Sequence, residues 1–275
     1  MFSKWKSACL IILIGAFFTT CQYRQILKSG NLDLKYEAAI NYYENGDYYK
    51  AYPLLEELIA IYRGTSKAEK LFYYYAYCDY NLGDFYLANY RFKNFSKTYP
   101  NSEFAEECYF MAAYCHYRNS PKYSLDQTDT YSAINSLQLF VNRYPESKLA
   151  DSCNVLVDKL RAKLERKFFE ISNQYYHKRN YKAAIRSFEN TLLDFPDTKY
   201  REEIMSFILK SNYELAKNSI LAKKEKRFED TIKSYVKFAD SFPKSKFMKE
   251  AEAMYEDALK EKQKIENQKV LSNGL

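Results

Sequence analysis

Small and apolar residues recur along the chain in one repeated frame. A small residue stands 12 positions before a proline, an apolar residue follows it by four positions, and an aromatic residue directly precedes the proline. In one copy, Ala88, Phe92 and Tyr99 fall on a single face of an α-helix, because a helix turns every 3.6 residues. The frame therefore predicts an amphipathic helix in each of its four copies, at residues 85–102, 130–147, 181–198 and 228–245. A degenerate copy without the proline occupies residues 48–65.

Each frame ends in residues that stop one helix and start another. Proline lacks an N–H and clashes with the preceding turn, and a Ser or Thr two positions later can cap the next helix. Further turn signals lie upstream at residues 45–47, 82–84 and 178–180. We therefore predict pairs of antiparallel helices and an all-α fold, an α-solenoid of about five helix-turn-helix repeats with a C-terminal capping helix.

The same signals predict how the chain is divided. No break signal interrupts residues 150–177, so we expect one long helix there. The predicted segments are a signal peptide at 1–20, a lipid-anchored linker at 21–33, three N-terminal repeats at 34–147, the long connecting helix with two further repeats and the capping helix at 148–262, and a polar tail at 263–275.

The first residues have the pattern of an export signal. Lys4 and Lys6 precede an apolar run of roughly ten residues, which is typical of a secretory signal and shorter than the about 20 residues of a membrane span. An uncleaved anchor helix is the alternative. Cys21 stands where a bacterial lipoprotein signal places its lipid acceptor, although Phe18 and Thr20 replace the usual Leu and Gly or Ala. The pattern predicts lipidation at Cys21.

Composition favours helices that bind other proteins. The chain has 29 Tyr, 19 Phe and one Trp, but only six Gly and six Pro. Tyrosine is enriched where proteins meet, because its large ring also carries a polar tip. The formal net charge is +7. Acidic residues alternate with the basic ones in segments such as 158–170, so we interpret these segments as solvated helix faces and expect no nucleic-acid partner.

Residue patterns typical of catalysis are missing from the sequence. It contains no phosphate-binding glycine loop, G-x-S-x-G or H-E-x-x-H motif. His116 and His177 have no carboxylate or cysteine at ligand spacing, and Glu106 and Glu107 point in different directions on a helix. We expect no enzyme activity, no cofactor and no metal. Beyond the leader remain Cys78, Cys108, Cys115 and Cys153, which we interpret as buried thiols, with one or two disulfides as the alternative.

The frame resembles the tetratricopeptide repeat (TPR) family, which has the small residue, the apolar residue four positions on and the terminal proline at these offsets. The resemblance covers roughly residues 34–260, although the family's tryptophan is missing and the spacing exceeds the usual period. It implies a concave face lined by the first helix of each repeat. Transferring family positions by offset gives the candidate peptide-binding residues Tyr36, Tyr43, Tyr73, Tyr77, Tyr80, Asn81, Phe110, Tyr114, Tyr117 and Arg118. Packing between helices is the alternative role for these side chains.

The export signal, the lipid-acceptor cysteine and about five such repeats together resemble the BamD family of outer-membrane lipoproteins. That resemblance implies a scaffold of the β-barrel assembly machinery. Its partners would be the POTRA domains of a BamA-like insertase, other BAM subunits and unfolded outer-membrane proteins. Residues 22–24 lack the acidic cluster of a surface-export signal, which favours the periplasmic side of the outer membrane. The alternatives are another periplasmic TPR adaptor of the Tol–Pal type and a glycan-binding TPR lipoprotein.

Overall fold

The computed structural model describes residues 22–273, and every regular element within that range is a helix. The predicted signal peptide, the predicted lipid acceptor Cys21 and the last two residues lie outside the described residues. A short helical segment covers residues 22–28. The other helices are α2 (Leu32–Glu44), α3 (Tyr48–Ile61), α4 (Ser66–Leu82), α5 (Phe85–Thr98), α6 (Ala105–Asn119), α7 (Thr128–Arg143), α8 (Ala150–His177), α9 (Tyr181–Asp194), α10 (Arg201–Lys217), α11 (Leu221–Ser241) and α12 (Met248–Asn273).

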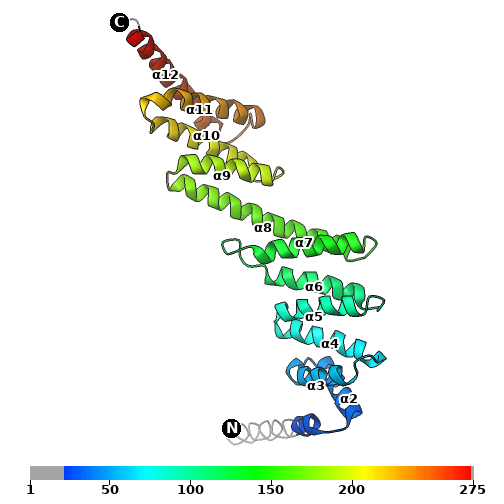
Figure 1. The fold of residues 1–275 in the computed structure, drawn as a ribbon. Helices are drawn as coiled ribbons and strands as arrows, with labels where there is room; N and C mark the ends of the chain where they lie inside the picture. The colour runs from blue at the N-terminus through cyan, green and yellow to red at the C-terminus, as the bar shows by residue number, and fades with distance from the viewer. Residues whose placement is uncertain (1–21, 274–275) are drawn as a thin grey trace, which may run out of the picture. The chain divides into compact units, whose positions relative to one another are not determined.

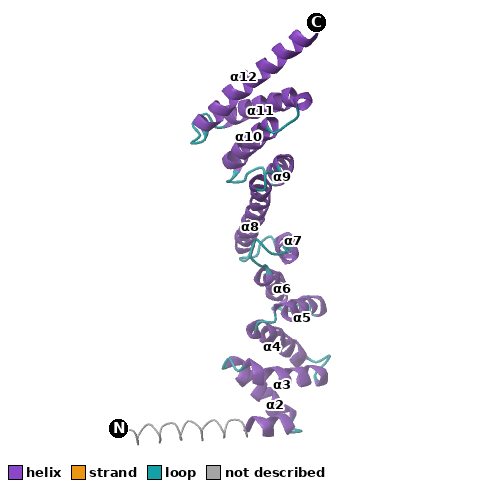
Figure 2. Ribbon diagram, turned by 90° about the vertical axis from the view of Figure 1, so that its left-hand side faces the viewer, coloured by secondary structure: helices purple, strands orange, loops and turns teal. Residues whose placement is uncertain are grey.

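The helices form two compact units. The N-terminal unit comprises the described residues up to Pro121 together with Leu125–Leu160. The C-terminal unit comprises Lys122–Ser124 and the described residues from Arg161 onward. Within the N-terminal unit, each of the helices α2 to α7 contacts the next one in the chain, and the same holds for α9 to α12 in the C-terminal unit (Figures 1 and 2). The predicted all-α solenoid of stacked helix pairs is confirmed.

The repeated frame builds the core of both units. Its small residue is fully buried in all five copies, as Ala51, Ala88, Ala133, Ala184 and Thr231. A small side chain at this place lets the neighbouring helix approach closely. The apolar residue four positions later is also fully buried in the first four copies, as Leu55, Phe92, Leu137 and Phe188.

Helix α8 has the bounds that the sequence predicts, and its two halves belong to different units. Cys153, Val157 and Leu160 pack in the N-terminal unit against a cluster that includes Phe140 from α7. Phe169 packs in the C-terminal unit against α9 and α10.

The sequence suggested that the serine or threonine after each proline caps the next helix, but it does not. Ser102 stands two residues before Phe104, the N-cap of α6, and its hydroxyl oxygen accepts the Phe104 N–H at 3.1 Å. Ser147 and Ser245 make the same local turn, and they also donate to Glu106 and Glu202 at 2.5 and 2.6 Å. The next helix begins about two residues after this hydroxyl, so the hydroxyl stabilises the turn that precedes the helix. Its bond to a glutamate also links the turn to the preceding repeat.

Helix α12 continues through Asn273 and so includes most of the segment 263–275 that we predict as a polar tail. No Gly or Pro interrupts the helix, and Ile265 is buried in a cluster with Ala216, Phe228 and Ala258. Ile265 therefore packs this part of α12 against α10 and α11.

Candidate functional site

Half-buried aromatic rings on α2, α4 and α6 form a continuous series of contacts in the N-terminal unit. The rings of Tyr73 and Tyr77 have centroids 4.8 Å apart, and Tyr77 lies 6.3 Å from Tyr80. Tyr80 in turn lies 6.3 Å from Tyr114 on the next repeat. We call the whole series the aromatic strip, and it consists of Tyr43, Tyr73, Tyr74, Tyr77, Tyr80, Phe110, Tyr114 and Tyr117.

The strip contains seven of the ten residues proposed from the sequence, and it adds Tyr74. Tyr74 stacks on Tyr43 at 4.3 Å and so joins α2 to α4. The TPR offsets did not give Tyr74, because they select only one face of each first helix. Tyr36 lies apart from the strip, where its ring contacts Tyr62 and the Lys67 ammonium.

Glu107 fixes the middle of the strip. Its carboxylate accepts hydrogen bonds from the Tyr73 hydroxyl, at 3.0 Å, and from the Tyr77 hydroxyl. Burial and this carboxylate raise the pKa of both hydroxyls, so they stay protonated donors at neutral pH. Glu106, its neighbour, accepts instead from Ser147, as expected for adjacent residues on a helix. No pattern in the sequence links Glu107 to α4, because the contact depends on how the two repeats pack.

Arg118 contacts the strip at Tyr80. Its Nη1 donates to the Tyr80 hydroxyl at 2.9 Å, and its guanidinium lies 4.4 Å from the centroid of the Phe85 ring. The side chain is exposed, so the guanidinium can also bind an anionic or carbonyl group of a partner. Asn81 is exposed as well, but its amide donates to the Tyr77 carbonyl oxygen at 2.8 Å.

An open groove adjoins the strip between α6 and the first half of α8. It has a volume of about 830 Å³, including space open to solvent. Its apolar lining includes Val155, which is 52% exposed, and its two charged side chains are Asp151 and Lys159. We call it the α6–α8 groove, and its lining is Phe110, Tyr114, Asp151, Ser152, Val155, Leu156 and Lys159. The α8 side of the groove was missed from the sequence, because α8 was interpreted as a connector.

The corresponding aromatic residues of the C-terminal unit pack around the buried rings of Phe169 and Phe188. Phe169 is 7% exposed and stacks on Tyr200 at 4.6 Å, and Phe207 stacks on the fully buried Phe188 at 5.4 Å. These rings hold α8, α9 and α10 together. Tyr176 also contacts Phe207, at 5.0 Å. Tyr176, Tyr200 and Phe207 are half-buried, as the strip residues are, but they pack around the buried Phe169 and Phe188.

Within residues 22–273 no three His, Cys, Asp or Glu side chains come together in a way that could hold a metal ion. No helix there has the length and apolar character of a membrane span. The four cysteines of this range are buried free thiols.

Residues 31–228 match the YfiO family, which is described as an outer membrane lipoprotein. This chain is a member of the YfiO family. The expected resemblance to BamD-type lipoproteins is thereby confirmed. Among curated proteins, none matches the sequence significantly.

The YfiO match includes α2 to α10, and with them the aromatic strip and the α6–α8 groove. Two solved structures are similar at a distance. The TPR domain of P58(IPK) has 14% identity and a TM-score of 0.40, over 86% of this chain and 66% of that one. The TPR2AB domain of yeast Sti1, solved with pHSP90, has 9% identity and a TM-score of 0.38, over 88% and 95%. Both TM-scores are below 0.5. The solenoid architecture is therefore established by the helix pairs of this chain and not by these similarities.

Proposed function

We propose that this YfiO-family lipoprotein is a non-catalytic, periplasm-facing scaffold of the β-barrel assembly machinery. In this role it is anchored in the outer membrane through a lipid on Cys21. It binds a BamA-type insertase together with other BAM subunits, and it receives segments of unfolded outer-membrane proteins. Membership of an outer-membrane lipoprotein family and the partly exposed aromatic surface of the N-terminal unit support this proposal.

The aromatic strip and the α6–α8 groove are the proposed receptor for these segments. An extended segment has alternating side chains and unpaired backbone groups. Phe110 and Tyr114 offer apolar ring faces beside an open groove, while Arg118 and Lys159 offer donors to carbonyl and carboxylate groups. Tyr73 and Tyr77 are held by Glu107 and so form the ordered base of this surface. The single observation that carries the proposal is the continuity of the strip with an open, largely apolar groove.

Photocrosslinking in the outer membrane tests the receptor. A photoreactive residue at position 152, on the groove wall, should crosslink to unfolded outer-membrane protein segments. Val155→Asp places a charge in the groove without removing a buried side chain, and it should abolish most of that crosslinking. Leu193→Asp is the matched control, because Leu193 is 76% exposed and belongs to the C-terminal unit. Equal crosslinking in both variants would contradict the proposed receptor.

Purification from outer membranes tests the partner class. Recovery of a BamA-like barrel protein with this chain supports the proposal. Recovery of Tol–Pal components, or of a glycan transporter, would replace it by one of the alternatives.

The proposed anchor has its own test. We expect the protein to be labelled by palmitate. Globomycin should change this labelling, and Cys21→Ser should abolish it. Labelling that persists in Cys21→Ser would contradict lipidation at that residue.

A further inference from the structure

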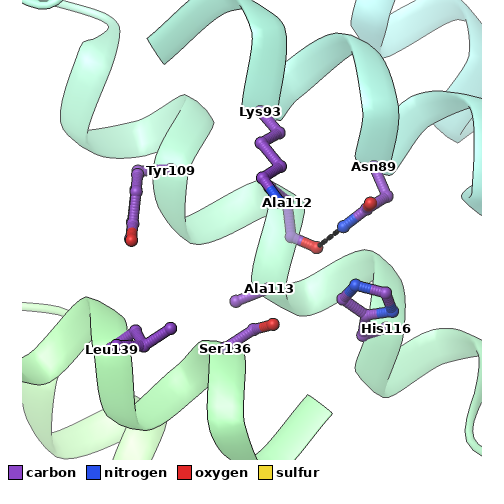
Figure 3. A pocket seen from close by; sticks show the side chains of 8 residues that line it. All are labelled: Asn89, Lys93, Tyr109, Ala112, Ala113, His116, Ser136 and Leu139. Atoms are coloured by element: carbon purple, nitrogen blue, oxygen red, sulfur yellow. Dashed lines mark hydrogen bonds between the residues drawn. The ribbon is translucent and has the colours of Figure 1, made fainter. Parts of the chain in front are cut away.

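A second hollow lies in the N-terminal unit, between α5 and α7, with α6 as its floor (Figure 3). It is a small hollow, and its volume of about 430 Å³ includes space open to solvent. None of its lining residues belongs to the aromatic strip or to the α6–α8 groove. The side chains surround an open space above two alanines, and the lining is Asn89, Lys93, Tyr109, Ala112, Ala113, His116, Ser136 and Leu139.

The walls of the hollow are held in place by hydrogen bonds. The Asn89 amide donates to the Ala112 carbonyl oxygen at 2.6 Å, which fixes α5 against the floor (Figure 3). The Tyr86 hydroxyl donates to Asp129 at 2.6 Å and links α5 to α7. The space exists because the floor residues Ala112 and Ala113 have side chains too small to fill it. The hollow is therefore preorganised.

The charges around the hollow suit one anionic group. Lys93 is exposed and has no ion pair within the described range, and no carboxylate is among the lining residues. The nearby Asp129 is engaged by the Tyr86 hydroxyl. His116 Nδ1 is shielded from solvent and has no hydrogen-bond partner among the described residues, so a ligand in the hollow can meet the imidazole only at Nε2. Burial lowers the pKa of His116, Asp129 opposes this effect and Lys93 adds to it, so the imidazole is neutral at pH 7.

The lining also has an apolar side. Tyr109 and Leu139 lie toward one end of the space and Asn89 and His116 toward the other, while Ser136 lies beside Leu139 (Figure 3). A ligand that fits both sides has a short aliphatic part and one charged end. A single ammonium next to an imidazole matches a monoanion, whereas a phosphate dianion usually meets arginine forks or several backbone N–H groups.

We propose that this hollow is a binding site for a short aliphatic carboxylate. The carboxylate accepts hydrogen bonds from the Lys93 ammonium and from the His116 imidazole, and the aliphatic part packs on Leu139 and Tyr109. The group has two sources, a free short-chain acid and the side chain of a glutamate in another protein. The site does not depend on the proposed role in barrel assembly.

The histidine resonances of the full-length lipidated protein in detergent provide the test. The sequence holds only two histidines, and the exposed His177 on α8 is the internal control. Butyrate and N-acetyl-glutamate N-methylamide are the probes, with butyramide and the glutamine derivative as uncharged counterparts. At least one carboxylate should shift the His116 ring signals saturably and raise the pKa of His116, while His177 stays unchanged and the amides have no effect. A larger shift of the His116 signals with butyrate indicates a free short-chain acid, and a larger shift with the glutamate derivative indicates a protein side chain.

Two variants and one control test whether the carboxylate binds in this hollow. Lys93→Gln removes the charged donor and should weaken binding about tenfold. Ser136→Leu fills the space from a wall and should abolish binding. Lys97→Gln changes an exposed lysine one turn further along α5, outside the lining, and should bind as the natural protein does. The proposal is overturned if neither carboxylate shifts His116, if amides and carboxylates act equally, or if Lys93→Gln binds with unchanged affinity.

Discussion

The two units of the molecule share one helical frame but differ in what they leave accessible. Phe92 in the N-terminal unit and Phe188 in the C-terminal unit occupy the same frame position, and both are fully buried. Two positions before the small residue, however, the first three repeats carry exposed tyrosines and the last two carry charged residues: Tyr49, Tyr86, Tyr131, Lys182 and Glu229. The rings of the first helices also differ in arrangement. The N-terminal unit has the continuous series of half-buried rings that adjoins the α6–α8 groove, whereas Tyr176 and Phe207 of the C-terminal unit pack around the buried Phe188 cluster.

This difference separates two roles within one repeat. Buried frame positions determine the helix pairing, and they are interchangeable between units. Positions beside the frame determine which partner chemistry a unit presents. The predictions below test this separation, beginning with the largest effect.

Truncation of the frame aromatic should destabilise each unit to the same degree. Phe92→Ala and Phe188→Ala each leave a cavity in a filled core, and each should lower the free energy of unfolding of its own unit by about 3–5 kcal/mol. Hydrogen exchange measured by mass spectrometry resolves peptides of α5 from those of α9. Tyr90→Ala and Leu193→Ala are controls at positions 64% and 76% exposed, and should stay within about 0.5 kcal/mol. Clearly unequal losses would show that the frame is not equivalent in the two units.

A buried ion pair distinguishes the N-terminal unit. Asp79 is 2% exposed and accepts from the Arg91 guanidinium, which also donates to Tyr52 and Tyr75 at 3.0 Å. Asp79→Ala leaves the arginine charge buried and unpaired, so the loss in unfolding free energy should be about 3 kcal/mol.

The comparison pair in the C-terminal unit is more exposed. Lys210 and Glu250 lie 2.7 Å apart, and the glutamate side chain is 56% exposed. Glu250→Ala should cost less than about 1 kcal/mol. Urea unfolding of the two variants checks the contrast, and similar losses would argue against it.

The cysteines report on one unit alone. All four described thiols lie in the N-terminal unit, and burial raises their pKa, to about 12 for Cys78 and Cys115. Thiol reagents at pH 8 should therefore react only after that unit opens. Phe92→Ala should increase the labelling rate at least about hundredfold, since each 1.4 kcal/mol changes the open population tenfold. Phe188→Ala should leave the rate unchanged, and acceleration by it would mean that the units do not open independently.

The tyrosine hydroxyls of the strip should contribute little to stability. Tyr77→Phe removes one hydrogen bond to Glu107, which keeps its bond from Tyr73, and should cost about 0.5–1.5 kcal/mol. Tyr213→Phe is the equivalent change in the C-terminal unit, where the hydroxyl donates to Asp257 at 2.8 Å. Urea unfolding should give similar small losses for both. A much larger loss at Tyr77 would indicate that the strip is part of the core.

The sequence predicts the local structure well, because the determining signals are local. The Gly83 turn, with its φ of +88°, and the bounds of α8 follow from residues next to one another in the chain. The α6–α8 groove and the contact of Glu107 with α4 depend on how repeats stack, so no local pattern contains them. The hydroxyl of Ser102 was assigned to the wrong role for a related reason: a cap and a turn two residues earlier need the same residue type.

Peptide affinity tests the central claim most directly. The measurement is fluorescence anisotropy of a labelled, extended peptide with alternating aromatic and polar residues, bound to the full-length protein in detergent. We predict that Tyr114→Ala combined with Val155→Asp weakens binding at least tenfold, whereas Tyr90→Ala combined with Leu193→Asp, at exposed positions outside the strip and groove, leaves it unchanged. Equal affinity of the two double variants would contradict the account.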